Sequence, residues 1–232
     1  MARPQIRVLH AAESAAARRS RVRKVDRALA DAYPDAWCAL RHENGWQLLV
    51  ATILSAQCTD ERVNLVTPAL FRRFPTPAKL AAADPAELEE LIHSTGFFRQ
   101  KTKALLGVAA AIASDFAGEL PRDLDTLVTL PGIGRKTANV VLGTAYGVPA
   151  IVVDTHVRRL ANRLGFTAED DPTKIEMDLH DLLPPASWTH FTHRLIHHGR
   201  RICQARKPRC GECSLAPWCP RIGVPDHAKS AT

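Results

Sequence analysis

The chain has 232 residues and a net charge of +7, and 46% of its residues are hydrophobic. This length allows one large domain or two small ones, each able to bury a core. No run approaches the roughly 20 apolar residues of a membrane-spanning helix, and the basic N-terminus lacks the apolar centre of a secretory signal. We therefore expect a soluble intracellular protein without a membrane span or a secretory signal.

The positive charge is concentrated at the N-terminus. Residues 1–27 hold eight Lys and Arg side chains against two acids, so six of the seven net positive charges lie there. We expect residues 1–24 to form a flexible basic arm, which either keeps the protein soluble or binds phosphate. The rest of the chain is nearly neutral, so its overall charge gives little support to nucleic-acid binding.

Helical patterns follow one another along most of the chain. Residues 46–57 are apolar almost all round, as in a buried central helix, and Asn44 is a suitable N-cap. Further helices are predicted at residues 60–74, 85–96, 101–116, 123–130, 135–146, 155–164, 172–183 and 186–203. The only β-like run, 149–154, is too short to found a sheet. The fold class is therefore all-α, with a domain boundary between residues 146 and 150, where the helical pattern is interrupted.

The stretch LPGIGRKTANVV, residues 130–141, predicts a helix–hairpin–helix. Gly132 and Gly134 can adopt positive φ angles and have no side chain to keep a ligand from the backbone, whereas Ile133 is expected to be buried. Amide groups at the start of the second helix form a site for phosphate, which positions DNA without reading its sequence. Lys136 either clamps phosphate or, because a helix N-terminus disfavours a cation, supplies a neutral amine for nucleophilic attack.

A nucleophilic lysine requires a carboxylate nearby, and Asp154 is the candidate. It follows the apolar run 151–153 and precedes THVRR, at the predicted start of a helix. The alternative is purely structural, because aspartate is a preferred N-cap and Arg158 lies one turn further along the helix. Lys136 and Asp154 are therefore the candidate catalytic pair, with phosphate binding and N-capping as their alternative roles.

Four of the six cysteines lie close together, with the spacing Cys203-x6-Cys210-x2-Cys213-x5-Cys219. Such crowding in a chain without a secretory signal indicates a metal site rather than disulfides. Structural zinc sites more often pair two C-x2-C motifs, whereas a cubane iron–sulfur cluster takes four thiolates at wider spacing. The spacing favours iron–sulfur and leaves zinc open.

The segment between the first two of these cysteines is basic. A metal that ties both of its ends would force this segment to bulge outward. We expect the bulge to present Lys207 and Arg209 to phosphates, so that the metal site acts as a scaffold. The alternative is that these charges only keep a surface loop soluble.

Together these residues resemble the endonuclease III family, the iron–sulfur branch of the helix–hairpin–helix DNA glycosylases. The resemblance rests on LSAQCTD, LPGIGRKTANVVL, IVVDTHVRRLANRLG and the cysteine loop, and extends from about residue 36 to residue 220. It implies two helical domains with DNA in the cleft between them. One is a six-helix barrel at 38–148 that contains the hairpin, and the other is an iron–sulfur domain made of 1–37 and 149–232. The resemblance also implies a monomer that acts on nucleoid DNA in the cytoplasm.

The implied activity is that of a bifunctional DNA glycosylase and apurinic/apyrimidinic lyase in base excision repair. Such an enzyme excises oxidised pyrimidines that are flipped out of duplex DNA. Lys136 matches the nucleophile that attacks C1′ of the deoxyribose, and Asp154 matches the carboxylate that supports its activation and stabilises positive charge on the sugar. The resulting Schiff base nicks the strand by β-elimination. The implied [4Fe–4S] cluster has four cysteine ligands, which are Cys203, Cys210, Cys213 and Cys219.

The resemblance implies DNA contacts as well. Gln57 matches the residue that fills the space left by the flipped base. Phe97 lies where better-known relatives have a bulky aliphatic residue that wedges into the base stack, and a phenylalanine is also an apolar wedge. The complete set of expected DNA contacts is Gln57, Phe97, Gly132, Gly134, Arg135, His156, Lys207 and Arg209.

Two other functions fit part of the sequence. A non-catalytic helix–hairpin–helix module would use Lys136 only to hold phosphate. The mispair adenine glycosylases share the cluster but usually lack a lysine at this position. They also carry a further C-terminal domain, for which the 13 residues after Cys219 leave no room.

Overall fold

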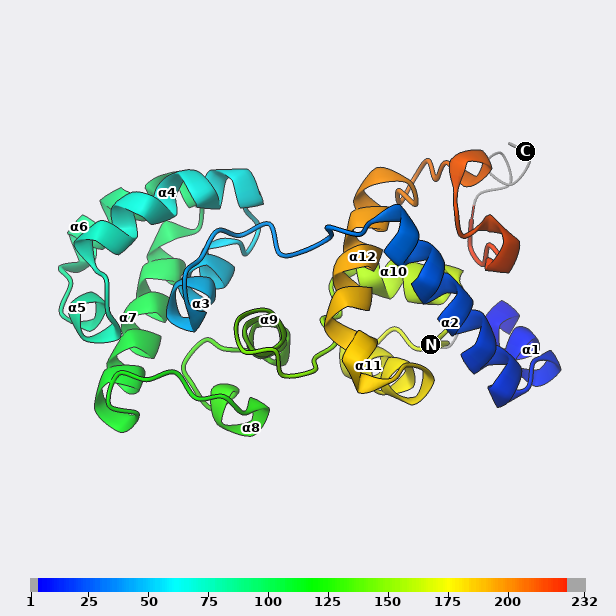
Figure 1. The fold of residues 1–232 in the computed structure, drawn as a ribbon. Coiled ribbons are helices and arrows are strands. Elements are labelled where there is room, and N and C mark those ends of the chain that lie inside the picture. Colours follow the sequence, from blue (N-terminus) through cyan, green and yellow to red (C-terminus); the bar gives the residue numbers. More distant parts are fainter. Residues whose placement is uncertain (1–3, 225–232) are drawn as a thin grey trace. The chain divides into compact units, whose positions relative to one another are not determined.

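The structure, a computed structural model, describes residues 4–224, and in this part of the chain all regular secondary structure is helical (Figure 1). The all-α prediction is therefore confirmed. None of the helices in the described residues combines the length and hydrophobicity that a bilayer requires. The chain divides into two compact units, one formed by residues 38–148 and the other by residues 1–37 together with 149–232.

The unit formed by residues 38–148 is built around helix α3 (Gly45–Leu54), most of whose side chains are buried. Its other helices are α4 (Asp60–Arg73), α5 (Pro77–Ala81), α6 (Pro85–Ile92), η1 (His93–Thr95), α7 (Phe98–Asp115), α8 (Leu124–Leu127) and α9 (Arg135–Ala145). Helix α3 contacts α4, α7 and α9 (Figure 1). Asn44 caps α3 as predicted, since its Oδ1 accepts a hydrogen bond from the Gln47 amide at 2.9 Å.

One of the differences from the predicted helices bears on the site. The helix expected to begin at Lys101 begins at Phe98, which makes Phe97 its N-cap residue. Helix α5 was not predicted, because its five residues are too few to show a helical period.

The second unit joins the N-terminal residues to the C-terminal part of the chain. Its helices are α1 (Pro4–Ala12), α2 (Ala15–Ala32), α10 (Thr155–Arg163), α11 (Pro172–Leu182), η2 (Pro185–Ser187), α12 (Trp188–Arg201), η3 (Cys210–Glu212) and η4 (Ala216–Trp218). Helix α12 packs against α2 and α10, and η4 of the cysteine loop contacts α2. Val22 and Leu29 of α2 share one buried apolar cluster with Phe166 and Phe191.

The prediction of a flexible basic arm is wrong for residues 4–24, and residues 1–3 lie outside the described part of the chain. Helix α1 buries Ile6 completely. Arg21 of α2 makes two hydrogen bonds to the carboxylate of Glu13, both 2.8 Å long, and donates to the Leu164 carbonyl at 2.5 Å. The sequence analysis counted the charges of this segment and did not predict these helices, because the Leu164 carbonyl and the apolar cluster with Phe166 and Phe191 lie far along the sequence.

Candidate active site and cysteine loop

The two glycines of the hairpin have different conformations. Gly132 has a φ of 75°, as expected, and a Cβ added there would lie 3.3 Å from the Cβ of Ala104. Gly134 has a φ of −90°, so the expected positive φ is wrong at this position. A Cβ at Gly134 would meet no atom within 4 Å. Glycine is therefore not required at position 134 by backbone conformation. Its lack of a side chain keeps the start of α9 open to a ligand.

The start of α9 has the features of an anion site. Gly134 is its N-cap residue and offers no side-chain hydrogen bond to the first turn. Such a helix end favours anions through its amide groups and the positive end of the helix dipole. Ile133 is buried as predicted, but its amide donates to the Leu130 carbonyl at 3.1 Å and thus belongs to the turn. Arg135 and the exposed Lys136 are the first two residues of α9.

Three of the expected DNA contacts line one cavity in the unit formed by residues 38–148. Gln57, Phe97 and Gly132 surround a space of about 280 Å³, and Lys101 and Thr137 also form part of its wall. Gln57 and Phe97 have φ angles of 54° and 49°, although neither is a glycine. Phe97 exposes 56% of its surface. Backbone strain at non-glycine residues costs about 1–3 kcal/mol per residue and is concentrated at functional sites.

Asp154 begins α10 in the second unit. Its Oδ1 accepts a hydrogen bond from the Val157 amide at 2.8 Å, so the structural alternative, an N-cap, is realised. An ionised carboxylate has two oxygens with several acceptor sites. Capping through Oδ1 is therefore compatible with a chemical role for the same side chain.

His156 is half-buried in the first turn of α10. Burial lowers its pKa, and the nearby Asp154 carboxylate partly offsets this effect. The Nδ1 atom lies 3.2 Å from Nη2 of Arg159, and a guanidinium can only donate. The neutral imidazole therefore accepts at Nδ1 and carries its proton on Nε2.

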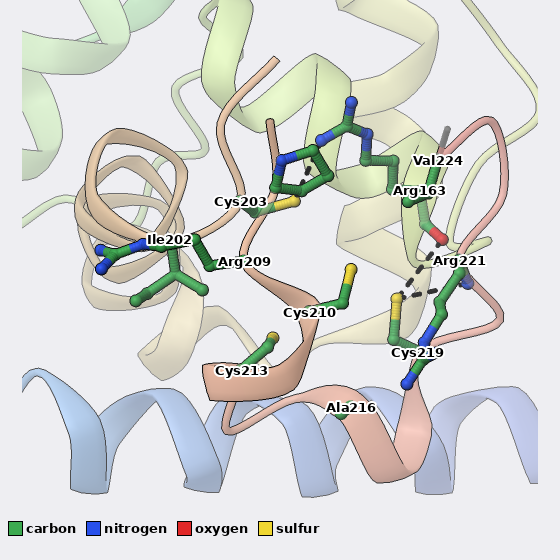
Figure 2. Close-up of a pocket in the computed structure, with 11 residues that line it drawn as sticks. Arg163, Ile202, Cys203, Arg209, Cys210, Cys213, Ala216, Cys219, Arg221 and Val224 are labelled. Atoms are coloured by element: carbon green, nitrogen blue, oxygen red, sulfur yellow. Dashed lines mark hydrogen bonds between the residues drawn. The ribbon is translucent and has the colours of Figure 1, made fainter. Parts of the chain in front are cut away.

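The four clustered cysteines line one small cavity whose remaining wall is mainly apolar (Figure 2). Arg163 Nη1 donates to Cys203 Sγ at 3.3 Å, and the Arg221 amide donates to Cys219 Sγ at 3.4 Å. Donors of this kind stabilise metal-bound thiolates. Burial raises the pKa of the Cys219 thiol to about 11, so a metal must displace its proton at neutral pH.

The donor set fits an iron–sulfur cluster. Four cysteines of one loop line the same cavity, and a [4Fe–4S] cluster is held by four cysteine thiolates.

The two basic residues expected to contact phosphate differ in their surroundings. Lys207 is exposed, as predicted. Arg209 is also exposed, but it forms an ion pair with Glu212 at 3.0 Å and donates to the Arg201 carbonyl. Part of the hydrogen-bonding capacity of Arg209 is therefore used within the protein. The ion pair depends on the short helix η3, which the sequence did not predict.

The sequence analysis did not identify three polar residues that face the cysteine loop or the cavity beside Gln57 and Phe97. Arg163 contacts Cys203, as described above, and His198 Nε2 lies 3.4 Å from Cys213 Sγ. Lys101 is buried in the wall of the cavity. The sequence signal for each is a polar residue one turn from a buried leucine of the same helix (Leu160, Leu195 and Leu105), and such a residue is more often a hydrogen-bonded core residue.

Comparison with family models defines the class of protein to which this chain belongs. The family model for the HhH-GPD superfamily of base excision DNA repair proteins matches residues 50–185. The model for the iron–sulfur binding domain of endonuclease III matches residues 203–219. The matched regions include the hairpin with Lys136, Asp154 at the start of α10, and all four clustered cysteines.

The chain is 54% identical to endonuclease III of Synechocystis sp. over 88% of this chain and 94% of that protein. It is also similar to a solved non-covalent endonuclease III–DNA complex, with a TM-score of 0.83 and 44% identity over 88% of this chain and 95% of that one. A trapped endonuclease III–DNA covalent intermediate matches with a TM-score of 0.83 and 43% identity over 88% of this chain and 96% of that one. The chain belongs to the endonuclease III family.

This membership confirms two predictions made from the sequence. The activity is that of a bifunctional DNA glycosylase and apurinic/apyrimidinic lyase of base excision repair. The cofactor is an iron–sulfur cluster.

Proposed function

We propose that this protein excises oxidised pyrimidines from duplex DNA and then nicks the strand, with Lys136 as the nucleophile. The observation that carries the proposal is the place of Lys136 in the first turn of α9. Its side chain is exposed, and its neighbour Thr137 lines the cavity that Gln57 and Phe97 also line. The trapped covalent DNA intermediate of endonuclease III supports a covalent step in a similar protein.

The chemistry assigns a separate step to each residue. The neutral amine of Lys136 attacks C1′ of the deoxyribose while the glycosidic bond breaks and the base leaves with the bonding electrons. Loss of the amine proton and opening of the sugar ring give an iminium between Nζ and C1′. Removal of a C2′ proton then expels the 3′ phosphate and cuts the strand. Asp154 is assigned to support the deprotonation of Lys136 and to stabilise the positive charge on the sugar.

Binding of the duplex is assigned mainly to the backbone. The start of α9 at Gly132, Gly134 and Arg135 takes a phosphate, and Lys207 adds a second cationic contact. Gln57 fills the space that the extruded base leaves, and Phe97 wedges into the base stack. The protein acts as a monomer on nucleoid DNA in the cytoplasm.

The cysteine loop is assigned a structural role. Cys203, Cys210, Cys213 and Cys219 would hold a [4Fe–4S] cluster, which supplies four iron–thiolate bonds when bound. These bonds tie both ends of the basic segment and make it present Lys207. Arg209 contributes less, because it is already paired with Glu212.

Borohydride trapping tests the nucleophile. Reduction of the iminium gives a stable amine, so the wild-type protein should form a covalent adduct with duplex DNA that contains an oxidised pyrimidine. Lys136→Gln should abolish the adduct, and Lys103→Gln, which alters an exposed lysine of α7, should not. No adduct with the wild type, or an undiminished adduct with Lys136→Gln, contradicts the assignment. Loss of DNA binding alone in Lys136→Gln, with no base released by the wild type, would indicate a non-catalytic module.

A further inference from the structure

Lys101 is a buried lysine to which the steps above give no role. It lies in the first turn of α7, and only 4% of its surface is exposed. Its Nζ donates to the Leu54 carbonyl at 2.7 Å and to the Thr95 carbonyl at 2.9 Å. Burying a charged group is unfavourable unless specific hydrogen bonds compensate for its lost hydration. The two carbonyls therefore compensate for the lost hydration of the Lys101 ammonium group.

Both carbonyls lie at helix ends. Leu54 is the last residue of α3, and Thr95 is the last residue of η1. Carbonyls at a helix C-terminus have no partner within their own helix and lie at the negative end of its dipole. A single ammonium group thus caps two helices whose ends are far apart in the sequence.

Each capped end leads directly into one of the two residues of the cavity wall that have a left-handed backbone, Gln57 and Phe97. Gln57 lies three residues after Leu54, and Phe97 lies two residues after Thr95. Both strained residues line the same cavity as Lys101. Left-handed conformations of non-glycine residues persist only where the surrounding structure holds them in place. The two hydrogen bonds of Lys101 hold the chain immediately before each of them.

We propose that Lys101 is a positioning residue that sets the separation of Gln57 and Phe97, so that both side chains enter the duplex together when the damaged base is extruded. This inference rests on the roles proposed above for those two side chains. Lys101 does not serve as a nucleophile, because its amine is buried and held by two carbonyls. It acts on the reaction only through the two turns that it joins.

The test compares a step that requires base extrusion with one that does not. Lys101→Met in the full, cluster-containing protein keeps an unbranched apolar side chain but removes every donor. Base release from a duplex with an oxidised pyrimidine should fall at least about tenfold, the factor that corresponds to the loss of one of the two charge-assisted hydrogen bonds. Strand cleavage at a preformed abasic site in single-stranded DNA should change less than about twofold, because no base is extruded there.

A fluorescent reporter makes the test independent of excision. With 2-aminopurine beside the lesion, binding of the wild-type protein should raise the fluorescence as the stack opens, and Lys101→Met should reduce this rise. Lys103→Met is the matched control and should behave like the wild type. Lys101→Arg, which keeps a charged donor, should restore part of the base release.

Two outcomes overturn the proposal: no change in base release with Lys101→Met, or an equal fall in base release and in cleavage of the single-stranded abasic site. If Lys101→Met is too unstable to purify, Lys101→Gln keeps two donors on a shorter side chain and serves the same comparison. Failure of the proposed function is distinguishable, because the wild-type protein itself would then release no base and form no borohydride adduct.

Discussion

Arg21 anchors the N-terminal helices, and its replacement tests whether they stabilise the folded protein. The Arg21 and Glu13 side chains are only 14% and 15% exposed. Arg21 donates to both carboxylate oxygens of Glu13 and to the Leu164 carbonyl, and its guanidinium lies 5.3 Å from the centre of the Phe166 ring. Arg21→Met keeps most of the apolar stem but removes all of these donors and leaves the Glu13 carboxylate without its cation.

The expected loss of stability follows from this geometry. Removing one partner of a buried ion pair costs about 3–5 kcal/mol. Because both side chains keep some contact with water, we expect the lower end, about 3 kcal/mol, in the free energy of unfolding measured by urea denaturation. Arg21 holds the pKa of Glu13 below its usual value of 4.5, so this contribution is present above pH 4.5. The difference between wild type and variant should therefore shrink as the pH falls below that value.

Arg19→Met is the matched control, because Arg19 is exposed on the same helix and its loss should change stability by less than about 0.5 kcal/mol. The double variant Glu13→Gln/Arg21→Met should be more stable than Arg21→Met alone, because it leaves no uncompensated carboxylate. A loss below about 1 kcal/mol for Arg21→Met, or one equal to that of Arg19→Met, would refute this reasoning.

Three further predictions concern the titration of a buried residue, the hairpin and the cluster. Burial lowers the pKa of His193 from 6.5 to about 4, so the unfolded state binds more protons below pH 6.5 and stability is lost as the pH falls. His193 should contribute about 2 kcal/mol to the stability lost between pH 8 and pH 5, and His193→Phe should remove this contribution in thermal unfolding. Gly132→Ala should destabilise the protein by about 1–2 kcal/mol because of its positive φ. Gly134→Ala should leave the melting temperature unchanged but weaken DNA binding in fluorescence anisotropy, and normal binding would exclude a phosphate at this helix end. Cys213→Ala should abolish the visible absorbance of the cluster and weaken DNA binding, whereas a variant that binds normally but excises no base would contradict the structural role.

The features that depend on neighbouring residues could be predicted from the sequence. Helical periods and caps arise from contacts three or four residues apart, and Asn44 and Asp154 cap the helices that their positions indicated. The cysteine spacing is a property of one short loop, and by itself it favours iron–sulfur over zinc. The family resemblance rests on these same local motifs.

Only the tertiary structure decided the roles that depend on distant partners. Arg21 belongs to the segment predicted as a flexible arm, but its acceptor at Leu164 lies far along the chain in the same unit. Lys101 belongs to a predicted amphipathic helix, and its importance lies in two carbonyls that the fold brings to its amine. A sequence shows that a charge is present, but its burial and partners depend on how the helices pack. That packing decides whether a lysine or arginine is a solvated surface charge or an anchor of the site.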